Sequence, residues 1–133
     1  EENEIYIELS NRSSNPAALK LLEQQIQATA RIYGFHSVMQ SEYPGWQYRE
    51  DSRLRDAMKQ IYQNMFGKEA VVEAIHAGLE CGILLSRMPQ LDIVSTGPDI
   101  LDIHTPKERM NISSVERTYQ YVLEVLKYFT TNY

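Results

Sequence analysis

The first 42 residues show strand, helix and strand patterns in turn. Residues 4–10 place alternate apolar side chains on one side of an extended chain and polar ones on the other, which predicts a half-buried strand. An Asn-Pro pair at 15–16 suits a helix N-cap and first turn, and apolar residues then recur at helical spacing as far as Gly34. Residues 35–41 predict a second strand. This region therefore predicts a β-α-β unit whose helix covers one face of a sheet.

The rest of the chain, from a Pro-Gly turn flanked by aromatics at 43–46, alternates between helical stripes and short apolar runs. Helices are expected at residues 52–66, at 79–88 and from 113 onward, strands at 70–75 and 91–95, and a loop at 99–111. Short runs rich in Val and Ile suit strands buried on both faces of a sheet. The predicted fold class is therefore α/β, with one edge of an α/β sandwich here, and these strands need neighbours that the chain does not obviously supply.

Composition and charge narrow the classes of partner. The formal net charge is −5 and no block of Lys or Arg stands out, so we do not expect nucleic-acid binding. No apolar run approaches the ~20 residues of a membrane span, so no membrane partner is expected. A single cysteine, Cys81, excludes an internal disulfide and suits a reducing cytoplasm. Because the chain opens on Glu-Glu-Asn-Glu, without an initiator Met or a signal-peptide layout, we expect an excised piece of a longer polypeptide.

The first candidate for chemistry is the segment 74–82, where two glycines and a carboxylate lie at a strand-to-helix junction. Such junctions can present backbone N–H groups to an anionic or carbonyl ligand, and Gly78 permits close approach of a ligand to the backbone. A tight turn with Glu80 as a helix-dipole partner explains the same residues. Cys81 with His76 five residues earlier makes a weaker nucleophile candidate, because nothing identifies an oriented base.

Two further side chains could bind ligands. His104 lies in the loop between Asp102 and Pro106, where it is either a metal ligand or an ordinary surface histidine. No second His lies three or four residues away, so any metal needs ligands from elsewhere. Arg12 lies at the first strand-to-helix turn, where its guanidinium either grips a carboxylate through two hydrogen bonds or is simply solvated.

Several motifs together resemble one family. They are His76-Ala-Gly-Leu-Glu-Cys-Gly82, Ser95-Thr-Gly-Pro98, His104-Thr-Pro-Lys-Glu-Arg109, the segment from Ile7 to Ser14, and Tyr43-Pro-Gly-Trp46. They are similar to the closing signature of the bacterial aminoacyl-histidine dipeptidases, also called Xaa-His dipeptidases or peptidase D. This family belongs to the di-zinc exopeptidase superfamily that includes carnosinases and carboxypeptidase G. The resemblance covers nearly the whole chain, and the heptapeptide at 76–82 is its most specific part.

The resemblance implies a partial zinc-exopeptidase fold. Residues 1–42 would be the C-terminal β-α-β part of an α+β lid domain, and residues 43–133 the C-terminal part of the catalytic α/β domain. His104 would be a zinc ligand, Arg12 would bind the carboxylate of a dipeptide substrate, and Gly78 would contact substrate through its backbone. The full-length enzyme would hold two zinc ions, hydrolyse Xaa-His and related dipeptides with a zinc-activated water, work in the cytoplasm and form a homodimer.

The chain departs from the family in what it lacks. Members of the family supply a His-x-Asp motif, a bridging Asp, a Glu-Glu pair and a further acidic ligand from their N-terminal half, and this chain lacks that half of the pattern. We therefore expect no catalytic residue in this chain, no zinc held by it alone and no activity without an N-terminal part of the same polypeptide. Two alternatives stay open, a stand-alone binding or regulatory module and a superfamily peptidase with other dipeptide or tripeptide substrates. No role is implied for His76, Glu80 or Cys81.

Overall fold

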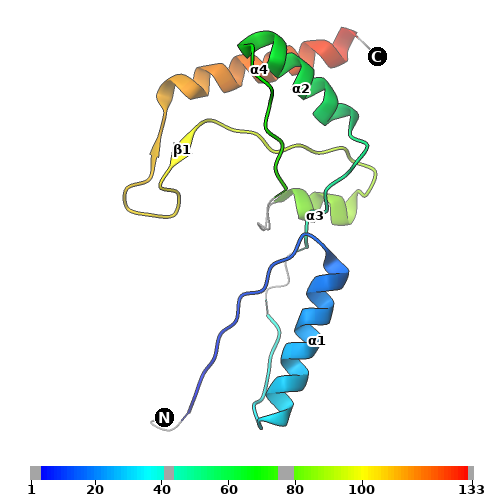
Figure 1. The fold of residues 1–133 in the computed structure, drawn as a ribbon, viewed down its shortest axis with the longest axis vertical. Helices are drawn as coiled ribbons and strands as arrows, with labels where there is room; N and C mark the ends of the chain where they lie inside the picture. Colours follow the sequence, from blue (N-terminus) through cyan, green and yellow to red (C-terminus); the bar gives the residue numbers. More distant parts are fainter. Residues whose placement is uncertain (1–3, 41–43, 75–79, 132–133) are drawn as a thin grey trace. The chain divides into compact units, whose positions relative to one another are not determined.

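The computed structural model describes residues 4–40, 44–74 and 80–131, and it divides into two compact units (Figure 1). The first unit is Glu1–Arg49 with Glu73–Leu91, and the second is Glu50–Val72 with Asp92–Tyr133. The described residues are mostly helical and form a single two-stranded sheet. None of their helices has both the length and the apolar character that crossing a membrane requires.

Helix α1, Pro16–Ile32, is the main element of the first unit and confirms the helix expected there. The Asn15 side chain accepts hydrogen bonds from the backbone N–H groups of Ala17, at 3.0 Å, and Ala18, at 3.3 Å. Such a cap satisfies N–H groups that have no partner inside the helix. Gly34 follows with a φ of +75°, a left-handed conformation that glycine adopts without steric cost. No residue of α1 is buried.

The second helix of this unit is α3, Glu80–Arg87, in the place that the sequence predicts. Glycines bring the backbone close to it. A Cβ atom added to Gly82 would lie 2.3 Å from the carbonyl oxygen of Pro44, and one added to Gly45 would lie 2.5 Å from that of Ser13. The Pro-Gly turn therefore packs on α3 through Gly82 and on the turn before α1 through Gly45, and neither glycine can be replaced without movement.

The predicted strands differ from the structure. Residues 4–10, 35–40, 70–74 and 91–95 carry no strand (Figure 1). A strand exists only through the ladder hydrogen bonds that a neighbour supplies, and no neighbour pairs with these segments in the described part of the chain. Their alternating or apolar patterns are those of strands, but a pattern does not provide a pairing partner. The expectation of an α/β sheet is therefore not met by these residues alone.

The second unit has its core between α2, Arg53–Phe66, and α4, Ile112–Thr131. Both helices were expected, and α2 ends at Gly67 with a φ of +64°. Met58 and Ile61 of α2 pack with Tyr121 and Val125 of α4. Partly buried residues surround this cluster: Leu54, Tyr62, Met65, Phe66, Val94, Tyr128 and Phe129.

Polar contacts within the second unit fix its helices. The Tyr121 hydroxyl donates a hydrogen bond of 2.8 Å to the Met58 carbonyl. Ser52 caps α2 by accepting from the Arg55 N–H at 3.0 Å. Asp92 accepts from the Ser52 hydroxyl at 2.6 Å and from the Leu54 N–H at 2.8 Å. The carboxylate of Asp92 therefore ties the segment after residue 91 to the positive end of α2.

A short hairpin precedes α4. Strands β1, Ile100–Leu101, and β2, Arg109–Met110, pair antiparallel, with Ile100 opposite Met110 and Leu101 opposite Arg109. The sequence predicts only a loop at 99–111, because two-residue strands are too short to show a period. The hairpin joins α4 through Ser114, which is 2% exposed and whose hydroxyl accepts from the Asp99 N–H at 2.9 Å. This junction fixes the base of the hairpin against the start of α4.

Candidate functional site

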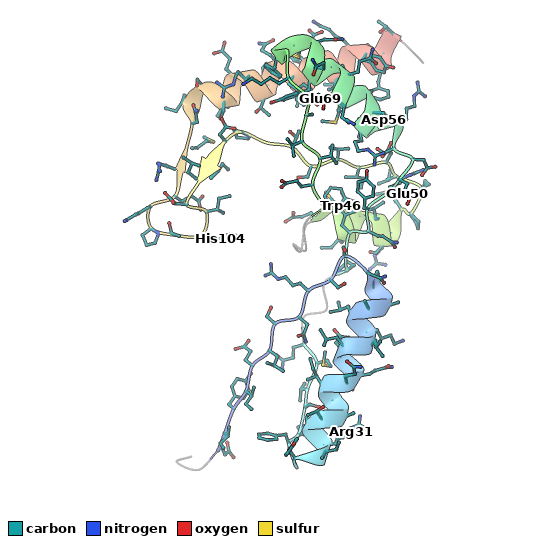
Figure 2. All side chains as sticks on the ribbon, in the orientation of Figure 1. Arg31, Trp46, Glu50, Asp56, Glu69 and His104 are labelled. Atoms are coloured by element: carbon teal, nitrogen blue, oxygen red, sulfur yellow. The ribbon has the colours of Figure 1, made fainter. Side chains whose placement is uncertain are left out.

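His104 lies in the loop that joins β1 to β2, at the outer part of the hairpin (Figure 2). The residue is exposed. Its backbone has a φ of +64°, and Asp102, two residues earlier, has a φ of +54°. These are the two non-glycine residues with positive φ in the described part of the chain. The backbone of the candidate ligand therefore has a left-handed conformation, which is uncommon for residues other than glycine.

Left-handed backbone is unfavourable for residues with a Cβ atom. Asp and His adopt it more readily than most residues, but it still costs about 1–3 kcal/mol at each position. Such a conformation persists only where surrounding contacts determine it. The loop at 102–108 must therefore contain interactions that hold both residues in this conformation.

The loop supplies these contacts itself. The Asp102 carbonyl accepts from the Thr105 N–H at 3.2 Å and from the Thr105 hydroxyl at 2.7 Å. The Thr105 hydroxyl accepts from the Lys107 N–H at 3.2 Å, and the Thr105 carbonyl accepts from the Glu108 N–H at 3.1 Å. The Glu108 carboxylate accepts from the His104 N–H at 2.9 Å. Asp102 and Arg109 form an ion pair across the base of the loop. These contacts close the loop into a turn, and His104 is exposed on its surface.

An imidazole in this position fits the role of one metal ligand. Neutral histidine nitrogens are common ligands for zinc and related metals, and an exposed ring on a fixed backbone is available to a metal from outside the loop. The described residues do not build a complete centre, because they contain no group of three His, Cys, Asp or Glu side chains that could hold a metal ion. His104 is thus a single candidate ligand, and other ligands would have to come from elsewhere.

Arg12 lies in the first unit, in the turn between residues 4–10 and α1. It is exposed, and within the described residues it makes no ion pair. Ser13, the next residue, is held by its contact with Gly45 and by its hydroxyl, which accepts from the Asn15 N–H at 3.1 Å. The turn that carries Arg12 is therefore fixed by its neighbours while the guanidinium stays accessible. Arg12 and His104 belong to different compact units.

The other motif residues lie at or near the start of α3. Gly78 and His76 lie outside the described residues. Glu80 is the first residue of α3 and is exposed, and Cys81 is partly buried with a free thiol. Sequence reasoning missed the contact of the Pro-Gly turn with Gly82. The sequence did contain a signal, because the heptapeptide ends on a glycine inside a predicted helix. A glycine at such a position often allows another segment to pack closely against the helix.

A shallow pocket in the second unit contains none of the predicted site residues. It lies at the N-terminal end of α2, beside α4, and is lined by Asp51, Ser52, Arg53, Asp56, Ala57, Gln60 and Tyr128. Acidic and basic groups alternate along it, so it offers no single charge to a ligand. The hairpin loop is therefore the better candidate site, because it carries a possible metal ligand, His104.

Comparisons with known proteins place these observations in a family. The model of peptidase family M20/M25/M40 matches residues 11–128. The cytosol non-specific dipeptidase of Escherichia coli (strain K12) is 31% identical over 126 residues, which is 95% of this chain and 26% of that protein. The crystal structure of aminoacylhistidine dipeptidase from Vibrio alginolyticus matches with a TM-score of 0.73 and 30% identity, over 86% of this chain and 24% of that one.

The resemblance drawn from the sequence motifs is confirmed by these matches. The chain spans about a quarter of the length of both relatives. The structural match also confirms that the chain has part of a dipeptidase fold. M20 peptidases are metal-dependent enzymes. Because the family model covers most of its residues, the chain belongs to peptidase family M20/M25/M40.

Proposed function

We propose that this chain forms the C-terminal quarter of a zinc-dependent dipeptidase and gives it one metal ligand, His104. The observation that carries the proposal is the exposed imidazole on a self-fixed hairpin loop, in a chain of the M20 family. When bound, zinc supplies Lewis acidity toward the scissile carbonyl. The general base and the remaining ligands come from an N-terminal part of the same polypeptide, so the 133 residues alone are inactive.

Arg12 and Gly78 would bind the substrate. The exposed guanidinium of Arg12 can donate two parallel hydrogen bonds to the C-terminal carboxylate of a dipeptide, a geometry that a lysine cannot provide. Gly78 would contact the substrate through its backbone. Residues 1–42 would belong to a lid domain and residues 43–133 to the catalytic domain.

The complete fold would be α/β. In a whole polypeptide, the segments at 4–10 and 35–41 would join the sheet of the lid, and those at 70–75 and 91–95 the sheet of the catalytic domain. The match to a quarter of a solved dipeptidase supports this, because sheet neighbours would lie in the three quarters that the chain does not cover. Exposed apolar side chains such as Ile7, Val38 and Val71 support it too. We place the enzyme in the cytoplasm and propose that it forms a homodimer.

The substrate class would be Xaa-His and related dipeptides. One relative is named an aminoacylhistidine dipeptidase and the other a non-specific dipeptidase, so a broader range is the second candidate. The ratio of kcat/KM for Ala-His to that for Ala-Leu separates the two, since an Xaa-His enzyme strongly favours the first substrate. The family assignment favours a peptidase over a stand-alone binding module.

Replacing His104 tests the assignment of the metal ligand. In the complete polypeptide, His104→Ala removes a metal ligand, so zinc affinity should fall by at least about 10–100-fold, and hydrolysis of Ala-His should fall with it. Zinc affinity is measured by competition with a chromophoric chelator, and stoichiometry by elemental analysis.

The matched control is His36→Ala, because His36 is also exposed but lies in the first unit, after α1. This variant should keep the zinc affinity and the activity of the unaltered protein. If His104→Ala still binds two zinc ions with unchanged affinity, His104 is not a metal ligand. Loss of both properties in His36→Ala as well would point to a general effect of histidine removal.

A further inference from the structure

The loop at 102–108 raises the question of what holds the backbone of His104 in its left-handed conformation. We propose that Glu108 is a positioning residue for His104, an inference that rests on the proposed function of that histidine. Glu108 would act through the backbone of His104 and would not bind the metal or the substrate itself.

The contacts of Glu108 support this role. Its carboxylate Oε2 accepts the N–H of His104 at 2.9 Å, and its own N–H donates to the Thr105 carbonyl at 3.1 Å. Glu108 therefore contacts two other residues of the loop: its side chain binds the backbone of His104, and its own backbone N–H binds Thr105. A hydrogen bond to a carboxylate is stronger than one between neutral groups, which suits a backbone that must be kept in an unfavourable conformation.

The other strained residue of the loop is held differently. Asp102 forms an ion pair with Arg109, and the strand register places Arg109 opposite Leu101, at the base of the loop. The Asp102–Arg109 pair thus fixes the base, and the Glu108–His104 hydrogen bond fixes the outer part. Because φ of His104 sets the direction of its Cα–Cβ bond, loss of the Glu108 acceptor changes where the imidazole points.

A ligand whose direction is fixed in advance binds metal more tightly than one that must be ordered. Groups that orient a metal ligand affect metal affinity by about 10–100-fold when they are removed. Partners usually orient the imidazole ring directly, whereas here the orientation is imposed through the main chain. Glu108 would therefore contribute at the lower end of that range.

The test uses four variants of the complete polypeptide: His104→Ala, Glu108→Ala, Glu108→Gln and Lys107→Ala. Glu108→Gln keeps an oxygen acceptor in the same place and loses the charge. Lys107→Ala is the matched control, because the Lys107 side chain is exposed and makes no hydrogen bond to the described residues. Zinc affinity is measured by chelator competition, and the cobalt-substituted proteins give a visible absorption spectrum that reports the geometry of the metal ligands.

Glu108→Ala should weaken zinc binding by about tenfold and alter the cobalt spectrum, Glu108→Gln should restore most of both, and Lys107→Ala should change neither. The thermal unfolding midpoint, compared in the metal-free proteins so that zinc binding does not contribute, should stay the same in all four, because none of the substituted residues belongs to the core cluster. Two results would overturn the inference: full zinc affinity in Glu108→Ala, or equal losses in Glu108→Ala and Glu108→Gln. If His104→Ala loses affinity in those cases, the proposed function stands, whereas an unaffected His104→Ala contradicts the proposed function itself.

Discussion

Helix α1 and the pair α2 and α4 have similar sequence patterns and different surroundings. Both regions carry an apolar stripe at helical spacing and an N-cap that accepts backbone hydrogen bonds. α2 and α4 bury a cluster around Tyr121, whereas no residue of α1 is buried. An amphipathic pattern therefore forms a helix in either place, but it forms a core only where the chain itself supplies the facing surface.

The two units also differ in how they are held together. In the second unit, apolar side chains from α2 and α4 interlock around Tyr121. In the first unit, the close contacts are between backbones, where Gly82 and Gly45 allow the Pro-Gly turn to approach. Removing side-chain volume should therefore damage the second unit, and adding side-chain volume should damage the first. Two substitutions, Tyr121→Ala and Gly82→Ala, test this contrast, each with a control variant.

The largest effect is expected for Tyr121→Ala. Tyr121 is 6% exposed, packs against Tyr62 and Phe66, and donates a hydrogen bond to the Met58 carbonyl. Its loss leaves a cavity and removes the hydrogen bond to the Met58 carbonyl, so the free energy of unfolding should fall by about 3–5 kcal/mol. Urea unfolding followed by far-ultraviolet circular dichroism measures it.

Tyr119→Ala is the control for this substitution. Tyr119 lies on the same helix, two residues away, but is 61% exposed. Its removal should change the free energy of unfolding by no more than about 0.5 kcal/mol. Equal losses in the two variants would show that the α2–α4 contact is not the core of the second unit.

An intermediate effect is expected for Gly82→Ala in the first unit. The added methyl group would lie 2.3 Å from the Pro44 carbonyl oxygen, so the turn or α3 must move. Alanine favours a helix over glycine by about 1 kcal/mol, but overpacking should outweigh this and leave a net loss of about 1–3 kcal/mol. Trp46, the single tryptophan, lies next to Gly45, so its fluorescence during urea unfolding reports this region.

Gly97→Ala provides the comparison. A Cβ atom at Gly97 meets nothing within 4 Å, and this variant should be neutral or stabilised by about 0.4–1 kcal/mol through the unfolded chain. A Gly82→Ala protein as stable as Gly97→Ala would mean that the backbone approach at Pro44 is not needed for the first unit.

The same contrast explains how far the sequence could predict the fold. Helical spacing depends on residues three and four apart, so α1, α2, α3 and α4 could be predicted from local pattern, as could the glycine that ends α2. Strands depend on partners, and the segments at 4–10 and 91–95 have strand patterns without pairing in this chain. A local pattern therefore predicts the tendency of these segments and not their final state.

The candidate site shows a similar division. Roles for His104, Arg12 and Gly78 could be assigned only by the motif resemblance, because a loop histidine or a turn arginine has no distinctive spacing. The positive φ of Asp102 and His104 could not be predicted from the sequence, because neither residue is a glycine. The hydrogen bond from His104 to Glu108 joins two residues of a loop that has no regular sequence pattern, so it becomes visible only in the structure.

The smallest expected effect concerns pH and sharpens the assignment of the core. Burial, followed by the nearby Tyr62, raises the pKa of the Tyr121 phenol above its ordinary value of 10.0. Above pH 10 the unfolded chain therefore loses this proton more readily than the folded one, and stability falls as pH rises. The contribution is fully present below pH 10 and is lost as pH passes through the raised pKa.

Tyr121→Phe removes this one titration while keeping most of the buried ring. It also removes the hydrogen bond to Met58, which lowers stability at every pH, so the quantity to compare is the slope of the free energy of unfolding against pH. Between about pH 9 and pH 11, the slope should be shallower in Tyr121→Phe than in the unaltered chain. Tyr119→Phe should keep the original slope, because Tyr119 is mostly exposed. Equal slopes in all three proteins would mean that the Tyr121 phenol is as accessible to water as that of Tyr119, and the core between α2 and α4 would then be wrongly placed.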